Sequence, residues 1–221
     1  MNLKSGIALS LAFAAGIGVT LAIAQDKVGQ VPQPPKHDMP DMPPGMEKMM
    51  EACMQAAAPG EMHQFLAKSA GTWEGDVSMW MMPGMPESKS TCTTVMTPMM
   101  DGRFIKIETN GMMEGMGEFK GFGVYGFDNV SKSFQSIWVD NMGTGMMTGK
   151  GELSADKKVL SYNNTFNCPM TGGPKSMREV QTFIDDNHSK LEMFGPDMEG
   201  KEYKIMEINY TRKAASAGHA R

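Results

Sequence analysis

Hydrophobic and polar side chains alternate along most of the chain after residue 70, with the period of two that is typical of half-buried β-strands. The alternation is clear at Trp73, Val77 and Met79, which are separated by polar side chains. The pattern predicts strands at 72–81, 89–96, 103–109, 119–127, 133–139, 144–153, 158–166, 177–184, 190–194 and 202–211. A change of phase between Ile205 and Met206 predicts a β-bulge in the last of them.

The links between these segments are short and turn-like, as at Asp128-Asn129, and no helical pattern separates them. Short strands that follow one another in this way form an antiparallel meander. Because closure removes the exposed edges of a sheet, we predict a mainly β protein with a closed antiparallel up-and-down barrel of about eight to ten strands. A Greek-key sandwich is the alternative. The barrel domain is expected at 71–213.

The period changes in the residues before the strands. Apolar side chains at 46, 49, 50, 53, 54 and 57 fall on one face of a helix, which Pro59-Gly60 ends, and a second short helix is expected at about 61–68. We therefore predict one or two short helices within 46–70. Residues 25–45 are dense in proline and predict a disordered or polyproline-like tether, and 214–221 predict a flexible tail.

The first residues have the pattern of a secretory signal peptide. Lys4 supplies a positive charge, residues 6–23 are apolar or small, and Ala22-Ile23-Ala24 provides a cleavage motif. We expect 1–24 to be removed, which gives a periplasmic or secreted protein with no stable membrane insertion. The apolar run is long enough to span a bilayer if it is not cleaved, so inner-membrane anchoring is the alternative.

Charge and cysteine content restrict the partners and the covalent structure. The formal net charge is −4, the pI is about 5.6, and Lys and Arg form no cluster, which argues against nucleic acid and anionic membrane surfaces as partners. Cys53, Cys92 and Cys168 are an odd number, so one disulfide and one further thiol are the simplest arrangement in an oxidising compartment. Three pairings are open. We favour Cys92–Cys168, because both lie in the predicted barrel domain.

The segment 138–147 joins two predicted strands and has an unusual composition. In one interpretation it lies at the barrel mouth, where Trp138 forms an aromatic wall and Asp140 and Asn141 hold a polar group of a ligand. In the other it is an ordinary hairpin, in which Asp140 and Asn141 bond their own backbone and Gly143 and Gly145 supply positive φ or a bulge.

The barrel interior is a further candidate site, because small barrels either enclose one ligand or are filled by their own side chains. The glycines of the strand 119–127 could leave room for a ligand, which Trp73, Trp138 and the flexible Met146 and Met147 would line. A filled interior is the alternative.

The tether supplies a candidate metal site at His37, Met39 and Met42. Thioether and imidazole groups are soft or borderline ligands that suit Cu(I). Methionines from residue 46 onward have a simpler explanation, because their spacing is that of an apolar helix face.

Catalysis has little support in the sequence. The four histidines, His37, His63, His188 and His219, are scattered over the tether, a helix, a turn and the tail, where solvated side chains are the usual case. No G-x-S-x-G or H-E-x-x-H motif occurs. A G-x-G-x-x-G match at 121–126 lies within a strand pattern and lacks the following helix that a dinucleotide site needs. We lean against an enzyme, and the sequence identifies no cofactor.

Several stretches resemble a bacterial family of exported proteins known as domain of unknown function 1579. They are the helix-to-strand opening that contains Gly71-Thr72-Trp73, and the segments 79–81, 102–104, 126–129, 138–147 and 169–172. The resemblance covers about 62–213 and implies a lipocalin-like barrel without an established activity. Cysteine is not expected at Cys92 or Cys168 in this family, so a disulfide between them would be a local feature.

These observations lead to three hypotheses of function. The first is a binding barrel for a small, largely apolar molecule, with Trp73, Trp138, Asp140, Asn141 and Met147 as candidate binding residues. The second is a periplasmic copper-binding protein that acts through the tether. The third is a structural protein that binds a protein partner, or a second copy of itself, through the apolar face of the helix at 46–57.

Overall fold

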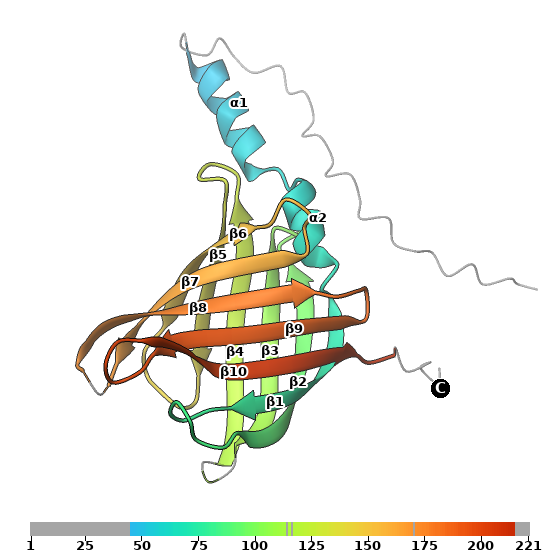
Figure 1. Cartoon of the computed structure of the whole chain (residues 1–221). Helices are drawn as coiled ribbons and strands as arrows, with labels where there is room; N and C mark the ends of the chain where they lie inside the picture. The colour runs from blue at the N-terminus through green and yellow to red at the C-terminus, as the bar shows by residue number, and fades with distance from the viewer. Residues whose placement is uncertain (1–44, 114, 116, 170, 215–221) are drawn as a thin grey trace, which may run out of the picture. The chain divides into compact units, whose positions relative to one another are not determined.

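The computed structural model describes residues 45–113, 115, 117–169 and 171–214. Ten antiparallel strands form a closed barrel in which each strand pairs with the next along the chain and the last pairs with the first (Figure 1). The strands are β1 (Gly71–Met79), β2 (Ser88–Met99), β3 (Phe104–Met113), β4 (Gly117–Asp128), β5 (Ser133–Asp140), β6 (Met147–Leu153), β7 (Val159–Cys168), β8 (Gly173–Phe183), β9 (His188–Pro196) and β10 (Glu202–Arg212). The predicted fold class, an up-and-down antiparallel barrel, is confirmed.

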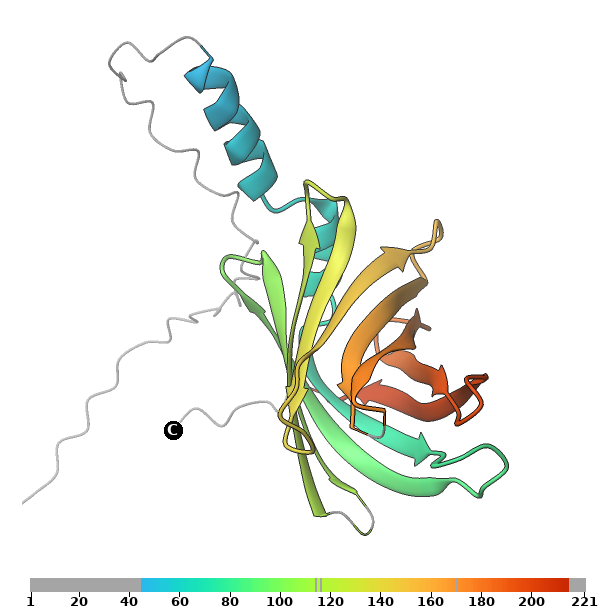
Figure 2. The same cartoon turned by 90° about the vertical axis from the view of Figure 1, so that its left-hand side faces the viewer.

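The local sequence pattern explains this architecture. Every connection is a hairpin, so the chain runs around the barrel in sequence order and no sheet edge is left exposed. Figure 2 shows β8 to β10 on the side of the barrel opposite β3 to β5. The bulge predicted from the phase change is present, because the register of β10 with β9 shifts between Lys204 and Met206. The strand predicted at 144–153 begins later, at Met147, because the preceding residues form a loop.

Helix α2 (Glu61–Ala67) covers one end of the barrel. Its buried Leu66 packs in a core with Phe134 and Leu160, and Phe65 makes edge-to-face contacts with Phe134 and Phe183, with ring centroids 6.2 and 5.1 Å apart. We call the opposite end the mouth. Its loops include 80–87, 141–146 and 197–201, which join β1 to β2, β5 to β6 and β9 to β10.

His63 corrects one expectation, because it is buried and not solvated. Its Nδ1 accepts a hydrogen bond from the backbone N–H of Gly60 at 3.0 Å, which caps the start of α2. The imidazole also meets the ring of Phe127 edge-on, with centroids 5.9 Å apart. Burial lowers the pKa of His63, so the neutral form is favoured in the folded protein. The residue holds α2 on the barrel.

Helix α1 (Met46–Ala57) has no buried residue. Its C-terminal end is held by two turns of the barrel: Arg103 Nε donates to the Ala57 carbonyl at 3.1 Å, and Asn129 Nδ2 donates to Ala56 at 3.0 Å and to Ala58 at 2.8 Å. The predicted apolar face, which includes Met49 and Met54, is exposed, and its role in partner binding stays a prediction. Neither described helix is long and apolar enough to span a membrane.

Candidate ligand site inside the barrel

A cavity of about 920 Å³ lies inside the barrel. Its lining begins at Phe65 and Leu66 of α2 and continues to Met142 and Met146 in a loop of the mouth. All ten strands contribute side chains to this lining. Successive residues of a strand point to opposite faces of the sheet, and the inward-facing residues of neighbouring strands are paired with one another, so one set of side chains from each strand surrounds the cavity. The lining is mainly aliphatic, aromatic and methionine side chains, so the barrel is hollow and largely apolar.

A small group of polar side chains interrupts this apolar lining. Glu179 on β8 is only 5% exposed, and its Oε2 accepts a hydrogen bond from Asn164 Nδ2 on β7 at 3.1 Å. The other end of the same amide, Asn164 Oδ1, accepts from the Ser136 hydroxyl on β5 at 3.4 Å. The Tyr125 hydroxyl on β4 is a further hydrogen-bond partner of the carboxyl group. Four strands thus supply one buried polar cluster around a carboxyl group.

The environment of Glu179 favours its protonated form. Burial raises the pKa of the carboxyl group from its ordinary value of 4.5 to about 7, although hydrogen bonds from Asn164 and Tyr125 act in the opposite direction. Burial also raises the pKa of Tyr125 and of Tyr162 well above the normal range, with the nearby Glu179 as a further cause for both. Glu179 therefore titrates near neutral pH among tyrosines that stay neutral.

Tyr162 adds a polar group without a partner. The residue is 1% exposed. Among the residues that the structure describes, its hydroxyl is the one buried side-chain polar atom without a hydrogen bond. Its ring meets that of Tyr125 edge-on, with centroids 5.4 Å apart. Gly151 on β6 makes room for it, because a Cβ there would lie 2.7 Å from the Tyr162 ring. The glycine therefore permits a large aromatic side chain beside the carboxyl group.

A second polar contact lies on the wall formed by β2, β3 and β10. The hydroxyls of Thr94 and Thr109 are 2.9 Å apart, and Thr94 donates to the Tyr210 hydroxyl at 3.4 Å. Burial raises the pKa of the neighbouring Cys92 thiol, so the thiolate is disfavoured. This wall is polar but uncharged.

The hairpin at 138–147 uses its polar side chains for its own structure. Asp140 Oδ2 accepts a hydrogen bond from Trp138 Nε1 at 3.0 Å, and its Oδ1 accepts from the backbone N–H of Met142 at 2.9 Å. Asn141 bridges to β4, where Oδ1 accepts from the Lys120 N–H at 2.8 Å and Nδ2 donates to the Glu118 carbonyl at 2.7 Å. The predicted bond to the hairpin's own backbone is present for Asp140, whereas Asn141 differs from the prediction and bonds the backbone of the neighbouring strand β4.

The glycines of this region differ from the prediction. Gly143 and Gly145 do not have positive φ. On β4, the space beside Gly121 and Gly123 is not free for a ligand, because the indole of Trp138 occupies it: a Cβ on Gly123 would lie 2.8 Å from Trp138 Cε3. Trp138 nevertheless lines the cavity, and Asp140 fixes its orientation. The two glycines allow the ring to lie flat against β4.

The other predicted lining residues also face the cavity. Met147 pairs with Trp138 across β5 and β6. Trp73 is at the end covered by α2, where its Nε1 donates to the Ser69 carbonyl at 2.9 Å and the Arg212 guanidinium lies 4.1 Å from its ring centroid. The structure therefore brings Trp138, Asp140 and Met147 together near the mouth and places Trp73 at the opposite end.

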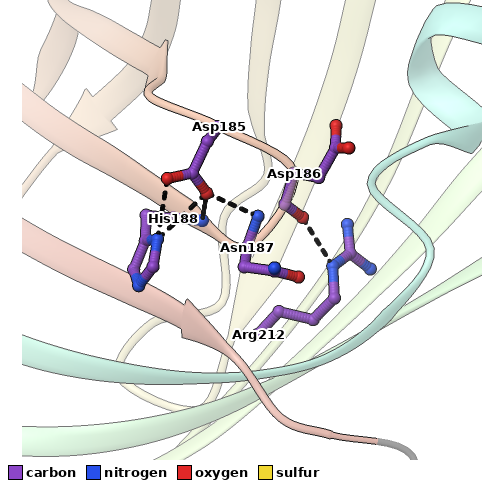
Figure 3. A network of polar contacts seen from close by, with 5 residues as sticks. All are labelled: Asp185, Asp186, Asn187, His188 and Arg212. Atoms are coloured by element: carbon purple, nitrogen blue, oxygen red, sulfur yellow. Dashed lines mark hydrogen bonds and ion pairs between the residues drawn. The ribbon is translucent and has the colours of Figure 1, made fainter.

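Arg212 connects the segments that close the α2 end. Its Nε donates to the Asp186 carbonyl at 2.8 Å (Figure 3), and its Nη2 donates to the Lys68 carbonyl at 2.9 Å. Asp185 in the same turn accepts from the backbone of Asn187 and from His188, which keeps the pKa of its carboxyl below the usual range. These contacts hold the turn between β8 and β9 and give the Asp185 carboxylate a structural role.

The structure does not contain the predicted Cys92–Cys168 disulfide, because Cys92 is a free cysteine in it. The physical reason is topological: β2 and β7 are five strands apart in both directions around the barrel, so the two residues lie on opposite walls. The candidate copper ligands His37, Met39 and Met42 lie outside the described residues. Within the described ranges, no group of three or more His, Cys, Asp or Glu side chains is placed to hold a metal.

Sequence reasoning missed Glu179 and Tyr162, which line the cavity, and Asn164, which donates a hydrogen bond to Glu179. Their signal was present but weak. Glu179 is registered opposite Tyr162, and Asn164 follows Tyr162 on the same face of β7. The positions become visible only once the register of β7 with β8 is known.

Comparison with known proteins identifies the family. The model of the family described as "Protein of unknown function (DUF1579)" matches residues 58–212. The chain belongs to the DUF1579 family. The match includes the whole barrel of this DUF1579 protein together with α2, and confirms the resemblance found in the sequence. No match was found among curated proteins.

The chain is similar to solved structures. The crystal structure of Rv2717c from M. tuberculosis is similar over 71% of this chain and 100% of its own, with 12% identity and a TM-score of 0.52. A redesigned β-barrel is similar over 70% of this chain and 100% of its own, with 11% identity and a TM-score of 0.39. At this level of identity, the likeness to Rv2717c shows a common fold alone.

Proposed function

We propose that this protein binds a small, largely apolar molecule inside the barrel. The observation that carries the proposal is the cavity of about 920 Å³, which lies in the size range of small-molecule sites. Such sites are mostly apolar with a few placed polar groups, and this lining has that composition. Burial of an apolar ligand in the cavity would be driven by removal of its surface from water.

The composition of the mouth suits the entry of an apolar ligand. Exposed methionines gather on its loops and strand ends, and methionine forms adaptable apolar surfaces that accommodate different shapes. They are Met81, Met82, Met85, Met112, Met142, Met146 and Met198. In the proposed function, the ligand passes these side chains and reaches Trp138 and Met147 first.

A pair of tryptophan substitutions tests the proposal with 1-N-phenylnaphthylamine, a dye whose fluorescence rises in apolar sites. Ile107→Trp fills the cavity from β3, whereas Ile137→Trp adds the same bulk to the outer face of β5, where Ile137 is 42% exposed. We expect the dye to bind the wild-type chain and the outer variant alike, with at least a tenfold loss of affinity in the inner variant. Met193→Trp fills the cavity from β9 and serves as a second inner variant.

Two results would overturn the function. One is an absence of dye binding to the folded wild-type chain. The other is equal binding by the inner and outer variants, which would place the dye on the surface. Circular dichroism of each variant establishes that the comparison is made between folded barrels.

We also propose that the protein acts after export, in the periplasm or outside the cell. The support is the pattern of residues 1–24, which is that of a cleaved signal peptide. The intact mass of the protein isolated from its host tests this location. A chain that begins at Gln25 is expected, and a full-length chain in the membrane fraction would contradict it.

A further inference from the structure

The proposed function leaves one feature of the cavity without a role, the buried carboxyl group of Glu179. We propose that the ligand carries a protonated amine, which pairs with Glu179 while the apolar body of the ligand fills the rest of the cavity. This inference rests on the proposed function and specifies the class of ligand.

The first argument is the missing counter-charge. A buried carboxylate is normally paired with a basic group, because burial of an unpaired charge is costly. Glu179 is 5% exposed and accepts hydrogen bonds from Asn164 and Tyr125, yet in the described part of the chain no Lys, Arg or His forms an ion pair with it. A cationic ligand would supply the partner that the chain does not.

The second argument is the aromatic surroundings of the carboxyl group. Tyr125 and Tyr162 stand edge-to-face beside it, and both interact electrostatically with Glu179. Ammonium groups bind favourably to the faces of aromatic rings. The unpartnered Tyr162 hydroxyl adds an acceptor for an ammonium N–H. A carboxylate, two tyrosine rings and a vacant acceptor form the chemistry of an amine site.

The third argument concerns the basic residues that also line the cavity. Three basic residues line the cavity, all at the α2 end: Lys157 forms an ion pair with Glu61 of α2, Lys68 interacts electrostatically with the same carboxylate, and the Arg212 guanidinium donates to backbone carbonyls. These groups are engaged in closing that end. A ligand with an anionic head would place a second negative charge near Glu179, so the cavity discriminates against carboxylates.

The titratable groups around Glu179 make the pH response interpretable. The interacting groups on other strands are Tyr125 on β4, Tyr162 on β7 and Tyr210 on β10, and burial raises the pKa of all three. They therefore stay neutral between pH 6 and 8. Glu179, with a pKa of about 7, is the group that changes charge in this range.

Three decyl compounds of equal chain length test the inference by displacement of the phenylnaphthylamine dye from the full chain. They are decylamine, decanol and decanoate, each below its micelle concentration. We expect the wild-type chain to bind decylamine at least tenfold more tightly than decanol at pH 8, and decanoate more weakly than decanol. Affinity for decylamine should rise about tenfold from pH 6 to pH 8 as Glu179 ionises, because the competent fraction of the protein rises by that factor.

Glu179→Gln keeps the shape of the side chain and removes the charge. We expect it to abolish the preference for decylamine over decanol, and circular dichroism establishes that the variant is folded. Glu152→Gln is the matched control, because Glu152 is exposed on β6 and is not among the cavity residues. It should retain the wild-type preference.

The outcomes separate the two proposals. Equal affinity for decylamine and decanol, a preference for decanoate, or an unchanged amine preference in Glu179→Gln would overturn the inference and leave cavity binding intact. Failure of decylamine to displace a dye that the inner tryptophan variants exclude would likewise overturn the inference and leave cavity binding intact. Absence of dye binding to the folded wild-type chain would overturn both.

Discussion

Replacement of Glu179 by glutamine should stabilise the empty barrel at alkaline pH. The carboxyl group is buried and its pKa is raised from 4.5 to about 7, so the folded state favours the protonated form. Between these two pH values the folded protein binds more protons than the unfolded chain. Stability must therefore fall as pH rises through this window, and reach a plateau above the folded pKa. Glutamine does not titrate, so Glu179→Gln removes this loss.

The magnitude follows from the two pKa values. A shift from 4.5 to about 7 corresponds to about 3.4 kcal/mol over the whole pH range. Between pH 5 and pH 8, the part of the range in which the protein is convenient to study, linkage gives a loss of about 2.5 kcal/mol in the free energy of unfolding. The side chain is almost fully buried, so solvent screening does not reduce this figure substantially.

Urea unfolding at pH 5 and pH 8 measures the effect for wild type and for Glu179→Gln. At each pH, the free energy of unfolding of wild type is subtracted from that of Glu179→Gln. The value at pH 5 is then subtracted from the value at pH 8, which cancels the contributions of all other titrating groups. We expect about 2.5 kcal/mol in favour of glutamine. A value within about 0.5 kcal/mol of zero would show that Glu179 is not desolvated and would refute the reasoning.

Three further predictions concern other parts of the fold. Gly121→Ala should destabilise the barrel by about 1–3 kcal/mol in urea unfolding, because the added Cβ meets the Trp138 indole. Gly143→Ala is the control, because open space surrounds Gly143, and it should change stability by less than about 0.5 kcal/mol. A similar loss of stability at both sites would contradict the packing of Trp138 against β4. The contribution of His63 to stability should be lost as pH falls below 6.5, because burial lowers the pKa of His63, whereas protonation of Glu179 acts in the opposite direction over the same range. The stability of wild type minus that of His63→Gln should therefore decrease as pH falls, and a constant difference would exclude a contribution from His63. Deletion of residues 25–58 should leave barrel stability within about 1 kcal/mol of the parent, since α1 has no buried residue, and a larger loss would reveal a packing role for the helix.

The sequence predicts the barrel well because its determinants are local. Each strand carries its own alternation and each link its own turn residues, so ten independent signals agree on one meander. The bulge near Ile205 was also visible, because an inserted residue changes the phase of the pattern. The disulfide prediction failed for the opposite reason. Pairing of Cys92 with Cys168 depends on distance around the closed barrel, which no local pattern contains.

The hairpin at 138–147 shows where local chemistry is informative and where it is not. Asp140 was expected to bond the backbone of its own hairpin, and it does, whereas Asn141 bonds the neighbouring strand β4, a contact that depends on strand pairing. The position of the Trp138 indole could not be predicted, because it depends on two glycines of the neighbouring strand and on their register with β5. Glycines that suggest empty space in a sequence are filled here by a side chain from the next strand.

Glu179 escaped detection because both faces of its strand are mixed. Along β8, Met177, Glu179 and Gln181 alternate with Arg178 and Val180, so the pattern alone does not decide which set faces inward. A shift of one residue in register would exchange the two faces. Pairing with Tyr162 on one side and with Met193 on the other decides it, and places the carboxyl group inside. The fold thus keeps a carboxyl group in a position that costs stability at neutral pH. A ligand with a protonated amine would offset this cost by pairing with the carboxylate, so the proposed ligand class predicts that Glu179 lowers the stability of the empty barrel and raises that of the loaded one.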